Sequence, residues 1–289
     1  MIRRLLVVRR GGLGDTLLLA PVLRALARRT PGVPIDFAGV REFTALLVGP
    51  GLADGARSSE DLAAYRFPHD AAVRKACSER HAAVVADDAA FARLADHDCF
   101  VQVFDPRPQP GVRAPLAQQI AAQLGLVLAW PHDAWLVRHP PPAVAGAVVV
   151  LAPGSGGRAK CWPRAHWLLL ARGLAETAKL AVVVGPAEIE RDDPRTWPWP
   201  VPVAFVVEAA PSVLAVRLHG AAAFVGNDSG PTHLAAMLGV PTVALFGPSD
   251  AVVYAPQGPC VEIVVAPSGE LAALAPSDVV AAVARVQGR

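Results

Sequence analysis

The stretch Phe224–Asp250, FVGNDSGPTHLAAMLGVPTVALFGPSD, constrains the fold of this chain more than any other. A short apolar run, Ala222–Val225, leads into a polar turn of Gly, Asn, Asp, Ser and Gly. A helical pattern begins near Pro231, and a second apolar run follows at Thr242–Phe246. Proline suits the first turn of a helix, where its missing N–H is no loss. The stretch therefore predicts a strand, a crossover helix and a second strand in succession.

The turn before this helix has the features of an anion site. Asp228 and Ser229 are good capping residues, and Gly230 lets another backbone or a ligand approach closely. Free N–H groups at the positively polarised start of a helix suit a phosphate or diphosphate. His233 lies four residues after Ser229, so both side chains can face the same side of the first turn. The alternative is a well-capped crossover that binds no ligand, and spacing alone favours neither.

Composition and charge exclude several classes of protein. With 289 residues, 53% of them hydrophobic, the chain is long enough for two domains with large cores. No apolar run reaches the roughly 18–20 residues that span a bilayer, and the start, MIRRLLVVRR, is too short for a signal-peptide core, so we expect a cytoplasmic protein. Four scattered cysteines, with no CxxC pair, indicate reduced thiols. A net charge of +2 gives no argument for nucleic-acid binding.

The chain begins with another strand, loop and helix. The apolar run Leu5–Val8 ends at Arg-Arg-Gly-Gly-Leu-Gly-Asp, and apolar residues at helical spacing follow. Loops of this kind form ligand sites at the carboxyl ends of strands in α/β domains. GGLGD is not GxGxxG, and Asp36 begins its apolar run instead of ending it, so an NAD-linked oxidoreductase is disfavoured. Asp15, at the mouth of the loop, is either a helix cap or a reactive carboxylate, and spacing favours the cap.

Three arginines, Arg24, Arg28 and Arg29, fall on one side of the first helix. Such a face is usually solvated. It also resembles the basic patches that bind an anionic partner or a membrane surface. A peripheral contact with the inner face of the cell membrane is therefore the second interpretation of this patch.

Apolar strand-like runs alternate with helical segments in both halves of the chain, which predicts α/β domains with parallel sheets. The proline-rich stretch His139–Pro142 is the best linker candidate. After it the pattern restarts with the apolar run Ala147–Leu151 and a glycine-rich loop, Pro153–Lys160. We expect one domain over residues 1–140 and a second over residues 141–289, facing each other across a cleft, with the last helix able to pack back on the first domain.

Lys160 follows a run of small residues, where a backbone can approach a phosphate while the ammonium supplies charge. The motif GxxxxGK[ST] is absent, so this is not a Walker A loop, and nucleotide hydrolysis by that machinery is not expected. For Lys160 taken alone, a solvated surface lysine is the favoured alternative.

Three blocks, GGLGDTLLLAP, KCWPRAHW and VGNDSGPTHLAAMLGVPTVALFGPSD, together resemble the signature blocks of glycosyltransferase family 9, the heptosyltransferase type. The resemblance runs from end to end of the chain in the right order. It implies the GT-B architecture of two facing Rossmann-like domains, with the acceptor on the N-terminal side and the nucleotide-sugar on the C-terminal side. It also implies transfer of a sugar, typically heptose from ADP-heptose, onto the lipopolysaccharide core or a related glycan.

The resemblance assigns roles to individual residues. Asp15 matches the family's proposed general base, with Gly12 and Gly14 in the acceptor-side loop around it. The family's lysine holds the donor phosphates, its helix-start residues bind the diphosphate, and an acidic residue lies beside the donor sugar. The residues that match donor-binding positions are Ser155, Lys160, Glu188, Asp228, Ser229, Gly230 and His233. Glu188 falls where the family places an acidic residue near the ribose, and Glu190 is its rival.

These assignments describe an inverting transfer. A carboxylate within reach of the attacking hydroxyl removes its proton, while helix-start N–H groups and a lysine stabilise the departing nucleoside diphosphate. No DxD motif appears, so we expect no metal and no other cofactor. The expected partners are a nucleoside-diphosphate sugar and a lipid-linked or oligosaccharide acceptor.

A nucleotide-sugar-binding protein of the same fold without transfer activity is the alternative function. The segment Val40–Arg80, which would help to shape the acceptor site, matches no family block, so the donor sugar and the acceptor stay open. Retention of both Asp15 and Lys160 favours the enzyme, because a binding protein has no need of the base.

Overall fold

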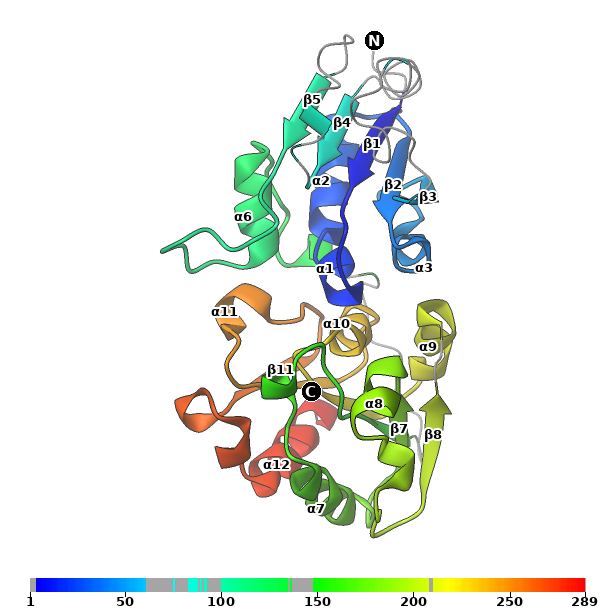
Figure 1. Cartoon of the computed structure of the whole chain (residues 1–289), viewed down its shortest axis with the longest axis vertical. Helices are drawn as coiled ribbons and strands as arrows, with labels where there is room; N and C mark the ends of the chain where they lie inside the picture. The colour runs from blue at the N-terminus through cyan, green and yellow to red at the C-terminus, as the bar shows by residue number, and fades with distance from the viewer. Residues whose placement is uncertain are drawn as a thin grey trace. The chain divides into compact units, whose positions relative to one another are not determined.

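The computed structural model describes residues 4–60, 75, 83–87, 89, 91–92, 100–134, 136, 148–207 and 210–288. It divides into two compact units, Met1–Ala134 and Trp135–Arg289. Each unit contains one parallel β-sheet with helices connecting its strands, which confirms the expected α/β class (Figure 1). The expected linker, His139–Pro142, lies outside the described residues, and so do two of the four cysteines, Cys77 and Cys99.

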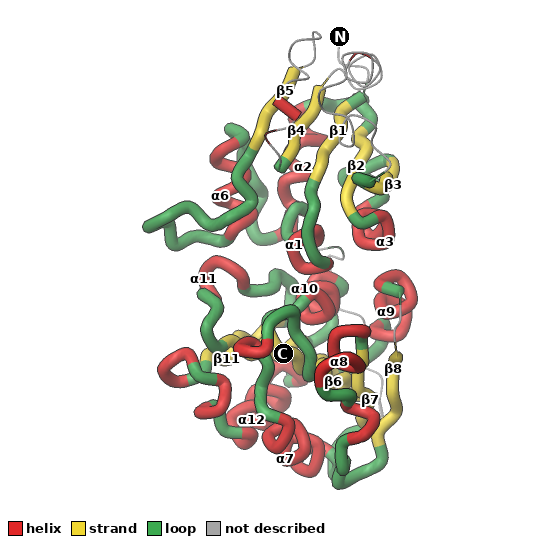
Figure 2. Tube along the Cα trace, viewed as in Figure 1, coloured by secondary structure: helices red, strands yellow, loops and turns green. Residues whose placement is uncertain are grey.

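The N-terminal unit is built on a five-stranded parallel sheet in the order β3-β2-β1-β4-β5 (Figure 2). Its strands are β1 (Leu5–Val8), β2 (Ile35–Gly39), β3 (Gly55–Ser58), β4 (Ala83–Ala86) and β5 (Phe100–Val103). Its described helices are α1 (Leu13–Leu17), α2 (Ala20–Arg29), α3 (Arg41–Thr44) and α6 (Leu116–Gln123), with short 3₁₀ turns at Ala45–Leu47 and His132–Ala134. The strand order reverses between β1 and β4, and α/β sheets bind ligands outside the carboxyl ends of strands at such a switch point.

The helix expected after the first loop is broken into two. α1 ends at Leu17, and α2 begins at Ala20 with Pro21 in its first turn. A proline inside a continuous helix removes one backbone hydrogen bond and clashes with the carbonyl four residues earlier. The break at Leu18 and Leu19 avoids both costs, and α1 becomes a single short turn after the glycine loop.

The arginines of α2 are bound within their own unit. Arg24 donates to the Asp133 carbonyl at 2.7 Å, and Arg28 donates to both oxygens of the Asp133 carboxylate at 2.8 and 2.6 Å. Arg29 donates to the Leu124 carbonyl at 2.9 Å. These contacts attach α2 to residues 124–134, a role that neither sequence interpretation included. Within the described ranges, no helix is both long enough and apolar enough to cross a bilayer.

The C-terminal unit is built on a six-stranded parallel sheet in the order β11-β10-β9-β6-β7-β8. Its strands are β6 (Val148–Ala152), β7 (Lys179–Val184), β8 (Val203–Val207), β9 (Ala223–Asn227), β10 (Thr242–Phe246) and β11 (Val261–Val265). Its described helices are α7 (Arg164–Leu174), α8 (Pro186–Arg191), α9 (Pro211–Leu218), α10 (Gly230–Met237), α11 (Ala251–Tyr254) and α12 (Pro276–Gln287), with 3₁₀ turns at Arg158–Lys160, Pro194–Thr196, Pro267–Gly269 and Leu271–Ala273. The strand–helix–strand predicted from residues 222–246 is confirmed as β9, α10 and β10.

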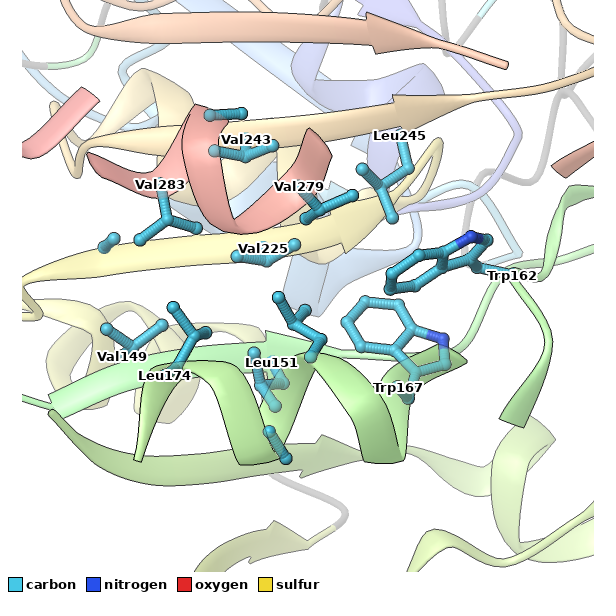
Figure 3. Packing of buried hydrophobic residues seen from close by; sticks show 14 of the residues in the cluster. Val149, Leu151, Trp162, Trp167, Leu174, Val225, Val243, Leu245, Val279 and Val283 are labelled. Carbon is cyan, nitrogen blue, oxygen red and sulfur yellow. The ribbon is translucent and has the colours of Figure 1, made fainter. Parts of the chain in front are cut away.

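One face of this second sheet is buried against α7 and α12. Alternate strand residues point to the same face of a sheet, and those facing the two helices are Val149, Leu151, Val225, Val243 and Leu245 (Figure 3). Trp167 of α7 packs edge-on against Trp162, with ring centroids 5.2 Å apart. The buried residues of α12 are Val279, Ala282, Val283 and Val286. The last helix therefore packs in the core of the C-terminal unit, where the sequence left packing on the first domain open.

Candidate functional site

In the N-terminal unit, Asp15 is both a helix cap and a partly exposed carboxylate. Its Oδ2 accepts a hydrogen bond from the Gly12 amide at 3.0 Å, which closes the first turn of α1. Its Oδ1 accepts from Nη2 of Arg9 at 2.9 Å, and 44% of its side chain is exposed. A side chain at Gly11 would collide with Asp15, since its Cβ would lie 2.8 Å from the Asp15 Cβ. Asp15 is therefore a helix cap, as one interpretation predicted. Because its carboxylate is partly exposed, the second interpretation, a reactive carboxylate, stays open.

Two further charged residues, which the sequence analysis did not include, lie beside Asp15. Arg9 directly follows β1, and Asp87 directly follows the neighbouring strand β4. Nη1 of Arg9 lies 3.1 Å from Oδ2 of Asp87, and the Arg10 amide donates to the same oxygen at 2.8 Å. The guanidinium therefore bridges two carboxylates at the carboxyl ends of adjacent parallel strands.

In the C-terminal unit, Asn227 fixes the glycine-rich loop against the end of β9. Its Nδ2 donates to the Pro153 carbonyl at 2.7 Å, and its Oδ1 accepts from the Trp162 amide at 3.1 Å. The residue is fully buried, so both hydrogen bonds are shielded from water. One amide side chain thus holds both ends of the loop that carries Ser155 and Lys160.

Asp228, the next residue, collects most of the predicted donor-binding groups around it. Its Oδ2 lies 2.7 Å from Nζ of Lys160, and its Oδ1 lies 3.9 Å from Nε2 of His233. Its backbone carbonyl accepts a hydrogen bond from the hydroxyl of Ser155 at 2.7 Å. A serine hydroxyl has one donor hydrogen, so this bond uses the donor hydrogen of the Ser155 hydroxyl. The structure thus brings Ser155, Lys160, Asp228 and His233 together.

The carboxyl group of Asp228 is held in its charged form. Only 9% of this side chain is exposed, and burial by itself raises the pKa of a carboxyl group. The neighbouring His233, Lys160 and Ser249 outweigh burial and lower the pKa of Asp228 to about 2. We attribute most of the effect to Lys160, because its ammonium is the partner at hydrogen-bond distance.

The start of α10 presents two backbone donors without partners. In the described structure, no group accepts a hydrogen bond from the amides of Ser229 and Gly230. The amides of Thr232 and His233, by contrast, both donate to the Ser229 carbonyl. Unpaired N–H groups at a helix start carry a partial positive charge. The start of α10, directly after Asp228, and the Lys160 ammonium therefore both offer hydrogen-bond donors.

Glu188 lies in an adjoining pocket instead of this cluster. It caps α8, since its Oε2 accepts from the Gly185 amide at 2.7 Å. A side chain at Gly154 would collide with the Glu188 carboxylate in its present position. The pocket has a volume of about 230 Å³ and is lined by Gly154, Ser155, Glu188 and Arg191 among others. The rival acid, Glu190, is exposed and does not line it.

The chemistry that these groups support is acid–base work in one unit and anion binding in the other. Asp15 offers an exposed carboxylate that can accept a proton. Lys160 and the α10 amides offer donors to a phosphate. Among the described residues, no three His, Cys, Asp or Glu side chains are placed to hold a metal ion together.

Comparisons with known proteins agree with this arrangement. The family model described as glycosyltransferase family 9 (heptosyltransferase) matches residues 138–280. The fold is similar to that of E. coli heptosyltransferase WaaC with ADP, with a TM-score of 0.70 and 21% identity over 98% of this chain and 99% of that one. No curated protein sequence matches the chain.

Two further solved structures share the fold. The glycosyl transferase family 9 from Veillonella parvula DSM 2008 gives a TM-score of 0.75 and 16% identity over 99% of this chain and 97% of that one. E. coli ADP-heptose lps heptosyltransferase II gives a TM-score of 0.68 and 19% identity over 98% of each chain. The similarity in fold therefore extends over the N-terminal unit, which the family model does not cover.

The lowered pKa of Asp228 predicts how its replacement depends on pH. A pKa of about 2 in the folded protein, against an ordinary 3.8, stabilises the fold above pH 3.8, and this contribution is lost as the pH falls through 2. We expect Asp228→Asn to lower the free energy of unfolding by ~2 kcal/mol at pH 7, and by roughly half as much at pH 3. Urea titrations at both pH values measure the difference. An equal loss at pH 7 and pH 3 would contradict the assignment.

Proposed function

We propose that this protein is a glycosyltransferase, since the model of glycosyltransferase family 9 matches residues 138–280. In the proposed reaction it transfers a sugar from a nucleoside-diphosphate sugar, most simply heptose from ADP-heptose, to a hydroxyl of a lipopolysaccharide-core or related glycan acceptor. The proposal comprises inversion at the sugar carbon and independence from divalent metal. Glu188 lies in the pocket that we assign to the nucleoside ribose. The similar structure of E. coli heptosyltransferase WaaC is one with ADP, which supports the choice of nucleotide.

The observation that carries this proposal is the group of donors around Asp228. Lys160 has three N–H donors, and its hydrogen bond to Asp228 uses one of them. The remaining two are available to phosphate oxygens, as are the amides of Ser229 and Gly230. Preorganised donors of this kind stabilise the negative charge that develops on a leaving diphosphate.

Asp228 itself has a different role in the proposed reaction. Its anionic carboxylate repels phosphate but accepts hydrogen bonds from hydroxyl groups. The donor sugar carries such hydroxyls and lies next to the diphosphate. We therefore assign Asp228 to the sugar, with the ammonium of Lys160 balancing its charge.

Asp15 is the proposed general base. Each carboxylate oxygen has two lone pairs, and the described contacts use one on each, to Gly12 and Arg9. The remaining lone pairs can take the proton of an acceptor hydroxyl. The hydroxyl oxygen then bonds to the anomeric carbon, the bond from that carbon to the β-phosphate oxygen breaks, and its electron pair leaves with the diphosphate.

Replacing Lys160 tests the seat of the phosphates. We expect Lys160→Ala to weaken ADP binding by about 1.5–3 kcal/mol, because charge-assisted hydrogen bonds are lost. Isothermal titration calorimetry with ADP measures the change. Lys179→Ala is the matched control, since Lys179 is exposed and is not among the residues placed near the site. Equal ADP affinity in wild type and Lys160→Ala would remove Lys160 from the phosphate site.

Replacing Asp15 separates the enzyme from a nucleotide-sugar-binding protein. Asparagine keeps an oxygen for the Gly12 amide but loses the charge that pairs with Arg9, so we expect stability to fall by at most ~1 kcal/mol. We expect turnover to fall about 10²–10⁴-fold because the proton acceptor is gone. ADP release from ADP-heptose, with de-acylated, heptose-free lipopolysaccharide core as acceptor, measures turnover.

Two outcomes of that assay would count against the proposal. Equal turnover in wild type and Asp15→Asn would show that Asp15 is not the general base. A wild type that binds ADP-heptose tightly, yet transfers to none of a broad panel of glycan acceptors, would support the binding protein instead.

The proposed metal independence has its own test. Because Lys160 and the α10 amides can carry the phosphate charge, we expect turnover to be unchanged after treatment with EDTA and desalting. The control is the same assay with added Mg²⁺ or Mn²⁺. A loss of turnover that either ion restores would refute this part of the proposal.

A further inference from the structure

Arg9, Asp15 and Asp87 form one connected group at the switch point of the N-terminal sheet. β1 and β4 are adjacent and parallel, with Val8 opposite Ala86, so Arg9 and Asp87 leave the sheet side by side. This point, where the strand order reverses, is where α/β sheets place ligands. The group is therefore in the right place to act on the proposed reaction.

The three side chains differ in their access to water. Arg9 and Asp87 have only 8% and 4% of their side chains exposed, against 44% for Asp15. Arg9 binds Asp15 through Nη2 at 2.9 Å and Asp87 through Nη1 at 3.1 Å. The chain of contacts thus runs from a buried carboxylate, through a buried cation, to the exposed carboxylate.

This arrangement is costly, which calls for a reason beyond stability. Buried charges lose hydration, and even a paired buried charge is often no better for stability than apolar side chains. Within the described structure, Nε of Arg9 and Oδ1 of Asp87 are buried without a hydrogen-bond partner. Buried polar atoms without partners are rare, so the pairing is not optimised for stability alone.

We propose that Arg9 and Asp87 are positioning residues for Asp15: Asp87 fixes the guanidinium of Arg9, and the guanidinium fixes the orientation of the Asp15 carboxylate. Asp15 is then held from two sides, by Arg9 on Oδ1 and by the Gly12 amide on Oδ2. These two contacts restrict rotation of the carboxylate. This inference rests on the proposed role of Asp15 as the general base.

A double-mutant cycle tests the inference. We expect Asp87→Asn to lower kcat about 10–100-fold, the usual effect of a misplaced catalytic group, with ADP affinity unchanged. In the Asp15→Asn background, the same substitution is expected to cost nothing further, because Asp87 acts only through Asp15. For Arg9→Lys we expect kcat between those of wild type and Asp87→Asn, since an ammonium keeps the charge but not the planar fork that binds two carboxylates.

Asp36→Asn is the matched control for a purely structural effect. Asp36 is a buried carboxylate of the same unit, held by Arg4 and Arg57 at 2.8 and 2.7 Å, and it lies at the start of β2 instead of the end of a strand. We expect this variant to lower the melting temperature and to leave kcat unchanged under conditions where it is folded.

The outcomes separate the inference from the function on which it rests. Wild-type kcat in both Asp87→Asn and Arg9→Lys, together with an inactive Asp15→Asn, would overturn the positioning role alone. Equal fold losses from Asp87→Asn in the two backgrounds would also overturn it, because they indicate a structural effect. Full turnover in Asp15→Asn would instead overturn the proposed base, and the positioning role with it.

Discussion

The side chain of Asn227 determines the geometry of the C-terminal site. It binds the Pro153 carbonyl and the Trp162 amide, which are the two ends of the loop between β6 and α7. Lys160 lies on this loop, and Asp228 directly follows Asn227, so one buried amide holds the loop near Asp228, where the ammonium and the carboxylate are 2.7 Å apart. The adjacent, parallel strands β6 and β9 make this bridge possible.

In the N-terminal unit, too, one side chain connects the ends of two adjacent parallel strands, but that residue is an arginine. At the ends of β1 and β4, Arg9 takes the place between two carboxylates, Asp15 and Asp87. Arginine suits a buried bridge because its planar fork can bind two partners at once and its charge is weakly hydrated. Lysine suits the partly exposed position near Asp228, because its ammonium can keep one hydrogen bond while it offers others to a ligand.

The sequence predicted those parts of the structure that depend on neighbouring residues. The apolar runs predicted strands, and β1 and β10 lie at the predicted bounds, Leu5–Val8 and Thr242–Phe246. The edge strand β3 was missed because its residues, GARS, form no apolar run and are only half-buried. The Arg9–Asp87 pair was missed for another reason. Its members are 78 residues apart, and they meet only because β4, and not β2, lies on that side of β1.

The group around Arg9 and the group around Asp228 differ in the charges and hydrogen-bond donors that they present. The Arg9 guanidinium contacts two carboxylates, and the exposed one, Asp15, is on α1. Around Asp228, one carboxylate is balanced by Lys160, and the unpaired amides of α10 add partial positive charge. The first group presents an exposed carboxylate to a ligand, and the second presents hydrogen-bond donors that suit negative charge. A sugar transfer needs both, since the acceptor must lose its proton while the departing diphosphate gains an electron pair.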